Sequence, residues 1–550
     1  MSGTNGTQTE LVTLTIDGKV VRAAKGSTII QAATAAGIEV PFYCYHPHLS
    51  IPANCRICQV KVKNAPKLMV ACHTQVAEGM EVNTHHTSPE VQAAQAATLE
   101  FILINHPLDC TVCDQAGHCK LQDYHFEYNA KPSRFIENKV HKVKAEPLGP
   151  TVMLDGERCI MCTRCIRFCD EITETSEIGM LNRGDRSVIT VNPKKPLDNA
   201  LSGTVVDLCP VGALTHAKWR FNTRIWFTKQ TDSICPGCST GCNVKVAERD
   251  GEIVQVKARL NDKVNKEWLC DEGRYGFMRF LPKHRIVTPH IGGKAAELNA
   301  ALLEASKLKG QAALVLVSPD LTLEEFSVLK NLVDKTLKGA QVALAYRERP
   351  LSKVEKILVS PDYAANFRGA EFAGLVSGNL EESYAAALQK LRSGAVQQLL
   401  LVGERSIPLP DQDPALIEGI KKAAVSVGIL TDAGSAVAGA LKVVLPGRSI
   451  LEKSGLLVNR NLRLQYTDRV VPFPDGSEPE WRMLGRLAEK MGAKLTSAED
   501  ERALTLSYLS ATKQLSGVTI RQIKADGVCL KSLNAATSTA GSQTGAAQWS

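Results

Sequence analysis

Alternating apolar and polar residues predict a β-hairpin near the start of the chain. Residues 11–24 alternate around Asp17-Gly18, a dipeptide that favours a tight turn between two strands. Residues 27–37 then place apolar side chains on one helical face, with Ser27 as the expected N-cap. Further short strand-like runs follow, so this region predicts a small mixed α+β domain.

Beyond residue 290 the pattern changes to alternating strand-like and helical segments. Apolar runs at 312–317, 341–346, 397–403 and 442–447 are separated by amphipathic runs such as 323–339. This alternation predicts a parallel sheet with crossover helices.

Length and charge set broad limits on the number of domains and on the classes of partner. A chain of 550 residues is long enough for roughly three to five domains. The net charge of +8 is not concentrated in any run, so nucleic-acid binding is not indicated. No uninterrupted apolar stretch reaches the length of about 20 residues that a membrane helix needs, and we therefore expect membrane association only through partners.

The placement of the cysteines is the strongest chemical signal. Of 17 cysteines, all but Cys529 lie between Cys44 and Cys270. The first residues lack the basic and apolar segments of a secretory leader, so a reducing compartment is expected. There, clustered cysteines indicate metal or redox chemistry.

The first set comprises four cysteines: Cys44, Cys55, Cys58 and Cys72. Four thiolates are what a [2Fe–2S] cluster requires, and the short polar loop before Cys58 suits backbone that bends around inorganic sulfur. Zinc is the alternative metal, because four cysteines with an internal Cys-x2-Cys also suit zinc.

The second set contains only three cysteines, Cys110, Cys113 and Cys119, so a fourth ligand must come from elsewhere. His106 precedes Cys110 closely and is the predicted fourth ligand of a [4Fe–4S] cluster. A neutral imidazole removes negative charge and retunes the reduction potential. His118, next to Cys119, is the alternative ligand.

The third set follows the ferredoxin pattern for a [4Fe–4S] cluster. Its predicted ligands are Cys159, Cys162, Cys165 and Cys209. In two-cluster ferredoxins the fourth cysteine of such a run serves the other cluster. No second complete run exists here, so Cys209, which precedes a proline, is preferred to Cys169. A disulfide between Cys165 and Cys169 is a less natural alternative in so dense a ligand loop.

The fourth set predicts a third [4Fe–4S] cluster, with zinc as the alternative. Its ligands are Cys235, Cys238, Cys242 and Cys270. Gly237 and Gly241 permit tight backbone near the metal. A hairpin with an Asp250-Gly251 turn lies before Cys270 and would return the chain to the same site. The four sets leave Cys169 and Cys529 without an assigned role.

The ordered combination of motifs resembles a known family. The segments HPLDCTVCDQAGHC (106–119), RCIMCTRCIRFCDEI (158–172) and DLCPVGAL (207–214) resemble the G-subunit family, the large iron–sulfur subunits of bacterial NADH–quinone oxidoreductase (respiratory complex I). The segment SICPGCSTGCNVKV (233–246) is similar to the [4Fe–4S] domain of molybdopterin oxidoreductases.

The resemblance implies a multidomain α+β and α/β fold. It predicts a β-grasp ferredoxin-like [2Fe–2S] domain (1–88), a histidine-ligated [4Fe–4S] domain (89–150), a ferredoxin-type [4Fe–4S] domain (151–230), a molybdopterin-oxidoreductase-type [4Fe–4S] domain (231–285), a truncated molybdopterin-oxidoreductase-like α/β scaffold (286–535) and a disordered tail (536–550). It also implies that His106, not His118, is a ligand and that Cys169 is not. No metal-ligating cysteine is evident in the C-terminal half, so a bound pterin is not expected.

The resemblance implies an enzyme subunit without catalytic residues of its own. Electrons would come from the flavin of a neighbouring NADH-oxidising subunit, enter through the [2Fe–2S] and histidine-ligated clusters, and leave through the Cys159 set toward peripheral-arm subunits and quinone. No strand followed by G-x-G-x-x-G is present, so neither NADH nor flavin is placed on this chain. The implied location is peripheral, on the cytoplasmic face of the bacterial inner membrane.

Two other functions fit part of the pattern. The equivalent subunit of an NAD-linked hydrogenase or formate dehydrogenase would carry the same N-terminal clusters. A zinc-binding scaffold would use the cysteines without moving electrons.

Overall fold

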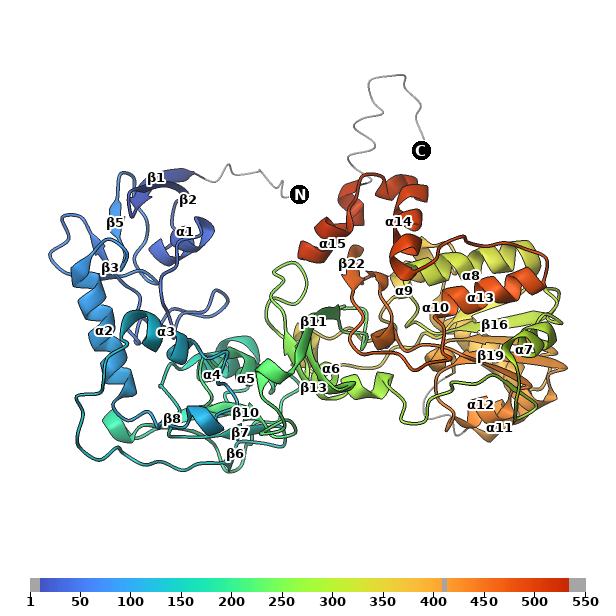
Figure 1. Ribbon diagram of the computed structural model, residues 1–550, viewed down its shortest axis with the longest axis horizontal. Coiled ribbons are helices and arrows are strands. Elements are labelled where there is room, and N and C mark those ends of the chain that lie inside the picture. The colour runs from blue at the N-terminus through green and yellow to red at the C-terminus, as the bar shows by residue number, and fades with distance from the viewer. Residues whose placement is uncertain (1–9, 408–412, 534–550) are drawn as a thin grey trace, which may run out of the picture. The chain divides into compact units, whose positions relative to one another are not determined.

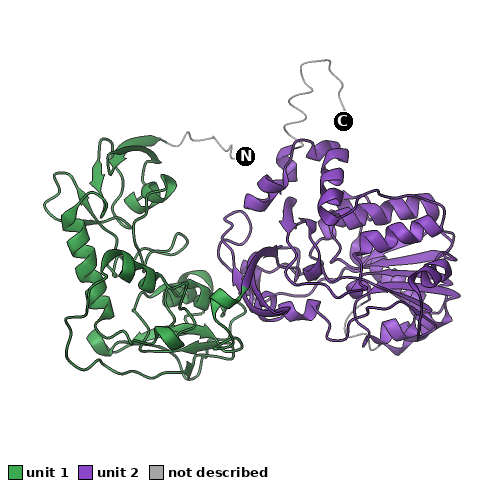
Figure 2. Cartoon of the chain, in the orientation of Figure 1, with its two compact units in different colours: residues 1–228 green, residues 229–550 purple. Residues whose placement is uncertain are grey.

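The computed structural model describes residues 10–407 and 413–533, so the tail predicted at 536–550 lies outside the described residues. The chain divides into two compact units, residues 1–228 and 229–550 (Figure 2). None of the helices described in these ranges is both long and apolar enough to cross a bilayer.

The first unit begins with a five-stranded β-grasp sheet. Its strands are β1 (Leu11–Ile16), β2 (Lys19–Ala24), β3 (Gln59–Val62), β4 (Met69–Val70) and β5 (Glu81–Asn83). The order is β2-β1-β5-β3-β4; β1 and β5 are parallel, and the other pairs are antiparallel. Helix α1 (Ile29–Ala35) packs its buried face into the same core as the sheet.

Two local predictions in this domain can be compared with the structure. Asp17 (φ 51°) and Gly18 (φ 78°) both adopt left-handed backbone, which confirms the tight turn. The predicted N-cap was wrong by one residue, because Thr28, not Ser27, caps α1. Thr28 forms a reciprocal capping box with Gln31, whereas the Ser27 hydroxyl donates back to the Ala24 carbonyl.

The rest of the first unit consists of short elements that carry long loops. Helix α2 (Pro89–Leu103) begins after Ser88, as predicted, and α3 (Lys120–Tyr128) packs against it. The remaining elements are β6 (Glu146–Pro147), β7 (Val152–Leu154), α4 (Arg164–Arg167), a π-helical turn (Phe168–Ile172), β8 (Ile178–Leu181), β9 (Val188–Val191), α5 (Thr204–Leu208) and β10 (Leu214–His216).

The second unit opens with a three-stranded antiparallel sheet. Its strands are β11 (Lys229–Ile234), β12 (Asn243–Arg249) and β13 (Glu252–Ala258), followed by α6 (Asp271–Tyr275). Asp250 (φ 54°) and Gly251 (φ 87°) form the predicted turn between β12 and β13.

A seven-stranded sheet forms the core of the α/β part of the second unit (Figure 1). Its strands, from one edge to the other, are β15 (Lys294–Ala295), β14 (His290–Ile291), β20 (Val443–Pro446), β19 (Val425–Leu430), β18 (Gln398–Val402), β16 (Ala313–Val317) and β17 (Gln341–Leu344). The five strands from β20 to β17 are parallel, and β14 and β15 are antiparallel additions. The predicted parallel sheet is therefore confirmed.

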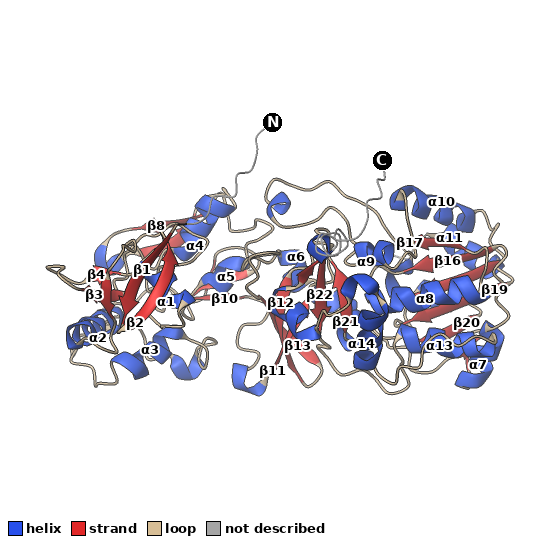
Figure 3. Cartoon of the chain, turned by 90° about the horizontal axis from the view of Figure 1, so that it is seen from above, coloured by secondary structure: helices blue, strands red, loops and turns tan. Residues whose placement is uncertain are grey.

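Helices cover both faces of this sheet (Figure 3). One face packs against α7 (Leu298–Ala305), α8 (Leu323–Thr336) and α13 (Glu480–Lys490). The other packs against α10 (Leu380–Arg392), α11 (Pro414–Lys422) and α12 (Ala436–Ala440). Alternate strand residues face the two cores: Val315 lies in the first and Leu316 in the second.

The chain ends in a smaller layer. Its elements are α9 (Phe367–Phe372), β21 (Gly455–Val458), β22 (Arg463–Thr467), α14 (Glu501–Ala511), α15 (Ile520–Asp526) and β23 (Val528–Cys529). Strands β21, β22 and β23 form an antiparallel sheet, and their apolar side chains pack with α14 and α15. The observed order of domains agrees with the mixed α+β and α/β fold expected from the motifs.

Candidate metal centres

The first cysteine set converges beneath the β-grasp sheet. Cys44, Cys58 and Cys72 are buried, and Cys55 is partly buried. The thiols form a chain of contacts in which Cys55 meets Cys44, Cys44 meets Cys72, and Cys72 meets Cys58. All four predicted ligands of the [2Fe–2S] cluster are therefore together.

The backbone around Cys55 is bent in an unusual way. Ala53 (φ 52°) and Arg56 (φ 58°) adopt left-handed conformations, which residues with a side chain rarely do. The bend lets the N–H groups of Asn54 and Cys55 donate to the Cys44 sulfur, and that of Ile57 to Cys55. Such donors stabilise negative charge on cluster sulfur.

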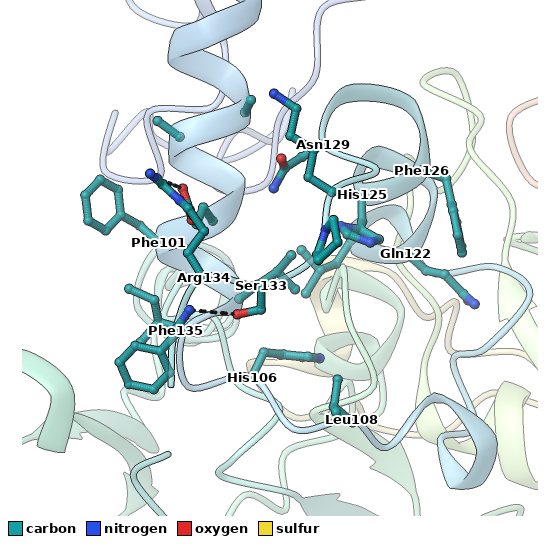
Figure 4. Close-up of a pocket in the computed structure, with 18 of the residues that line it drawn as sticks. Phe101, His106, Leu108, Gln122, His125, Phe126, Asn129, Ser133, Arg134 and Phe135 are labelled. Atoms are coloured by element: carbon teal, nitrogen blue, oxygen red, sulfur yellow. Dashed lines mark hydrogen bonds and ion pairs between the residues drawn. The ribbon is translucent and has the colours of Figure 1, made fainter. Parts of the chain in front are cut away.

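The second set surrounds a large hollow in the first unit. His106 follows α2, Cys110 begins a short 3-10 turn, and Cys119 precedes α3. These three ligands line a cavity of about 1280 Å³ together with exposed apolar side chains such as Phe101 and Leu108 (Figure 4).

His106 has the properties of a metal ligand. Burial lowers its pKa to about 4, so the imidazole is neutral and its lone pair is available at pH 7. Its buried Nδ1 has no hydrogen-bond partner among the described residues. His118 does not line the cavity, but neither does the predicted ligand Cys113, so His106 stays a prediction as the fourth ligand.

The remaining ligand of the second set, Cys113, lies against Gly212. A Cβ atom on Gly212 would fall 2.1 Å from the Cys113 sulfur. Only glycine can therefore occupy this position while the thiol keeps its place. Gly212 follows Cys209 closely in sequence, so the segment that carries a ligand of the third set also packs against Cys113 of the second set.

An ion-pair cluster also joins the second and third sets. Asp109, which precedes Cys110, accepts from Nε and Nη2 of Arg158 at 3.1 and 2.9 Å. Arg158 precedes Cys159 and is only 3% exposed. Lys144 adds a third contact to Asp109 at 2.7 Å. Charge-assisted bonds of this kind fix the spacing of the segments that carry them.

All four predicted ligands of the third set line one small cavity. They are Cys159, Cys162, Cys165 and Cys209, and the other lining residues are mainly apolar. Cys169 is buried nearby but does not line this cavity. The structure therefore groups Cys209, and not Cys169, with the ferredoxin-type run.

Burial governs the acidity of these thiols. It raises the pKa of Cys159 to about 11 and that of Cys209 to about 12. Metal-free thiols are therefore protonated at neutral pH, and iron binding must release protons.

The fourth set forms an equally complete site in the second unit. Cys235, Cys238, Cys242 and Cys270 line one cavity with three glycines: Gly237, Gly241 and Gly273. A Cβ on Gly273 would lie 3.1 Å from the Cys235 sulfur and 3.2 Å from the Cys270 sulfur, so glycine leaves this space open for a cluster. The Gly273 N–H donates to the Cys270 sulfur at 3.2 Å.

The α/β domain holds the fourth ligand loop in place. The Ser239 hydroxyl and N–H donate to the two Asp362 carboxylate oxygens at 2.6 and 2.9 Å. The Thr240 hydroxyl donates to the Leu358 carbonyl at 2.7 Å. These buried contacts make the cluster loop part of the domain core.

Zinc and iron–sulfur clusters ask different things of the same cysteines. A structural zinc needs four ligands around one ion, whereas iron–sulfur clusters distribute their four protein ligands over several irons. Within residues 10–407 and 413–533, no group of three or more His, Cys, Asp or Glu side chains is arranged to hold a single metal ion.

The crevice at the carboxyl edge of the parallel sheet is small. Ser318, Gly403 and Thr431 follow β16, β18 and β19, at the edge of a parallel sheet where ligands normally bind. These residues line a cavity of about 40 Å³, and an ion pair between Arg405 and Asp320 lies along its wall.

The sequence predicted the candidate ligands but not the residues that support them. Gly212, Gly273, Asp109 and Arg158 act through neighbours that are remote in sequence. Their only sequence signal is that each lies within a few residues of a ligand cysteine.

Family models match successive parts of the chain. Residues 9–87 match the "2Fe-2S iron-sulfur cluster binding domain", residues 95–134 the "NADH-ubiquinone oxidoreductase-G iron-sulfur binding region" and residues 149–215 "NADH-quinone oxidoreductase subunit 3, ferredoxin-like domain". Residues 228–280 match the "Molybdopterin oxidoreductase Fe4S4 domain" and residues 326–490 "Molybdopterin oxidoreductase". The chain therefore contains both 2Fe–2S and 4Fe–4S binding domains.

Curated relatives carry one recurring name. The G subunit of the NADH-quinone oxidoreductase of Rickettsia felis is 37% identical over 333 residues, which cover 59% of this chain and 49% of that protein. The G subunit from Streptomyces coelicolor is 34% identical over 402 residues, covering 72% and 47%. The NADH-ubiquinone oxidoreductase 75 kDa subunit of Reclinomonas americana is 42% identical over 281 residues, covering 51% and 40%.

The chain thus spans about half the length of the curated relatives it matches. These relatives confirm the resemblance to the G subunit that the cysteine motifs predicted.

Proposed function

We infer, from the similarity to the G subunits of NADH-quinone oxidoreductases, that this chain is an iron–sulfur electron-transfer subunit of such an enzyme. The observation that carries the proposal is the grouping of the cysteines: the third and fourth sets each line one cavity completely, and the four thiols of the first set contact one another. Iron–sulfur clusters supply one-electron redox chemistry, and the protein tunes their potentials through ligands, hydrogen bonds and burial.

The proposed content is one [2Fe–2S] and three [4Fe–4S] clusters. The [2Fe–2S] ligands are Cys44, Cys55, Cys58 and Cys72. The [4Fe–4S] ligands are His106, Cys110, Cys113 and Cys119 in the second set, Cys159, Cys162, Cys165 and Cys209 in the third, and Cys235, Cys238, Cys242 and Cys270 in the fourth.

Contacts among the ligand loops support a different order of transfer from the one expected from sequence. The loop of the third set contacts the first set through Arg167 and the second set through Arg158 and Gly212. We therefore place the Cys159 set between the [2Fe–2S] set and the His106 set, rather than at the exit.

The fourth set has a separate position in the chain. It lies in the compact unit 229–550, whereas the other three sets lie in the unit 1–228. The role we propose for the fourth cluster is structural, off the main electron path, as the resemblance to the G-subunit family implies.

The proposed partners are a flavin-bearing, NADH-oxidising subunit as the electron donor and peripheral-arm subunits leading to quinone as the acceptors. Association with the membrane, on the cytoplasmic face of the bacterial inner membrane, would come through these partners. No observation favours a hydrogenase or formate dehydrogenase over this assignment, because the relatives from Rickettsia felis, Streptomyces coelicolor and Reclinomonas americana are all named as NADH–quinone or NADH–ubiquinone oxidoreductase subunits.

The test is the iron and acid-labile sulfide content after anaerobic purification. The four clusters predict roughly 14 iron atoms per chain. A value near 10 would mean that one [4Fe–4S] cluster is missing, and the Cys235→Ser variant would show whether it is the fourth. Little iron together with stoichiometric zinc would overturn the proposed function.

A further inference from the structure

We propose that Arg164 and Arg167, two buried arginines on α4, act as positioning residues that clamp the [2Fe–2S] site to the Cys159 site and raise the potentials of both clusters. This inference rests on the proposed function, since it requires clusters at both sites. Neither arginine is a predicted ligand, and both lie in the third ligand loop between Cys162 and Cys169.

Arg167 contacts ligand residues of both sets. Its Nη2 donates to the Cys44 carbonyl at 2.6 Å and to the Cys162 carbonyl at 3.3 Å. Its Nη1 donates to the Ser50 carbonyl at 2.5 Å. One guanidinium nitrogen is therefore shared between a first-set ligand and a third-set ligand.

Arg164 makes a second bridge between the same loops. Its Nη2 donates to the Tyr45 carbonyl at 2.5 Å, and its Nη1 donates to the Leu208 carbonyl at 3.2 Å. Tyr45 follows Cys44, and Leu208 precedes Cys209. The two arginines thus join the first and third sets at both ends of the third set's ligand run.

Two further hydrogen bonds join the ligand loops of the first and third sets, a contact region that we call the junction. The Ser50 N–H donates to Glu171 Oε2 at 2.8 Å, and the Asn54 amide donates to the Met161 carbonyl at 3.4 Å. The planar fork of a guanidinium suits paired carbonyl acceptors better than a lysine ammonium does. The bridges therefore fix both the distance and the orientation of the two ligand loops.

The charges at the junction have a further effect. Arg164 and Arg167 are only 7% and 9% exposed, and in the described ranges neither lies within ion-pair distance of a carboxylate. The strongest negative groups that face Arg167 are Cys162, Glu171 and Cys44. Because a reduced cluster carries one more negative charge than an oxidised one, buried cations beside it favour reduction.

The experiment compares Arg167→Gln and Arg167→Lys in the full chain, by redox titration followed with electron paramagnetic resonance. R167Q is expected to lower the midpoint potentials of the [2Fe–2S] and Cys159 clusters together, while the His106 cluster keeps its potential. R167K retains the charge and is expected to return both potentials toward those of the wild type. Arg392→Gln is the matched control, because Arg392 is an exposed arginine on α10 that pairs with Asp413 at 2.8 Å.

Each outcome separates this inference from the proposed function. An iron-loaded R167Q chain with unchanged potentials would overturn the clamp and leave the electron-transfer assignment intact. A wild-type chain without iron would overturn the assignment itself. If R167Q fails to hold iron, Arg164→Gln and Arg164→Lys give the same comparison, and equal potentials in that pair would overturn the clamp.

Discussion

His106 is the proposed ligand whose chemistry departs most from that of the other proposed ligands. We expect His106→Cys to keep the cluster but to lower its reduction potential, because a thiolate adds negative charge where a neutral imidazole stood. A redox titration that resolves each cluster measures this shift. His118→Gln is the control and should leave every potential unchanged. A shift confined to the Cys44-set signal would contradict the ligand assignment.

Cys169 and Cys209 are the two alternatives for the fourth ligand of the third set. We expect Cys169→Ser to leave the iron content unchanged, because Cys169 does not line the site. Cys209→Ser is expected to remove the third cluster, about four irons per chain. Iron analysis of the two purified variants decides between them, and iron loss in the Cys169 variant alone would reverse the assignment.

At the scale of residues, the sequence predicted the ligand sets because clusters need four ligands at short spacings. Cys55 and Cys58, for example, lie on one tight loop, and that spacing is visible in any sequence. The supports of the clusters could not be predicted in this way. Gly212 is required by Cys113 across a fold contact, and Arg167 reaches Cys44 from a segment far along the chain.

At the scale of elements, turns and alternation were the reliable signals. Asp17-Gly18 and Asp250-Gly251 both form the expected turns, because glycine and aspartate tolerate left-handed backbone. The Thr28 cap was missed because Ser27 and Thr28 are equally good caps in isolation, and only Gln31 closes the box on Thr28. The π-helical turn Phe168–Ile172 has no local sequence signal and was not predicted.

One buried ion cluster links the helices that cover the large sheet. Lys453 donates to Glu325 on α8 at 2.7 Å and to Glu480 on α13 at 2.6 Å. All three side chains are at most 2% exposed. The Lys453 ammonium therefore offsets the charge of two buried carboxylates at once.

We expect Lys453→Met to lower the free energy of unfolding of the second unit by about 3–5 kcal/mol, because it leaves two carboxylates buried without their cation. Burial raises the pKa of Glu480, so the loss should grow as the pH rises and more of Glu480 becomes ionised. Thermal unfolding at several pH values measures the effect. Lys421→Met, which breaks the exposed pair with Glu418, should cost no more than about 1 kcal/mol, and an equal loss in both variants would contradict the account.

At the scale of the whole molecule, the distribution of exposed apolar side chains is uneven. Leu108 is 91% exposed, Phe101 76% and Phe126 68%, and all three line the cavity at the His106 site. Exposed apolar clusters of this kind commonly mark protein interfaces. The cavity at the second set is therefore the surface where a partner subunit is expected to dock.

We expect Leu108→Asp to preserve the iron content but to reduce co-purification with partner subunits, because a buried unpaired carboxylate would oppose docking. Quantified pull-down of the tagged chain from its host measures the loss. Leu303→Asp changes a leucine that is 63% exposed in the other unit and should have less effect. Undiminished assembly of the Leu108 variant would exclude this surface.

The distant fourth ligand of the third set gives its cluster the character of a cross-link. A cluster bound by Cys165 and Cys209 would close residues 166–208 into a loop, and this loop includes β8, β9 and α5. Closing such a loop restricts the unfolded chain and stabilises the folded one. We expect limited proteolysis to cut within 166–208 only after iron is removed, and equal cleavage with and without iron would contradict this. Loss of this one cluster would then expose a long segment to cleavage, so the inorganic group would serve as a structural staple as well as a redox centre.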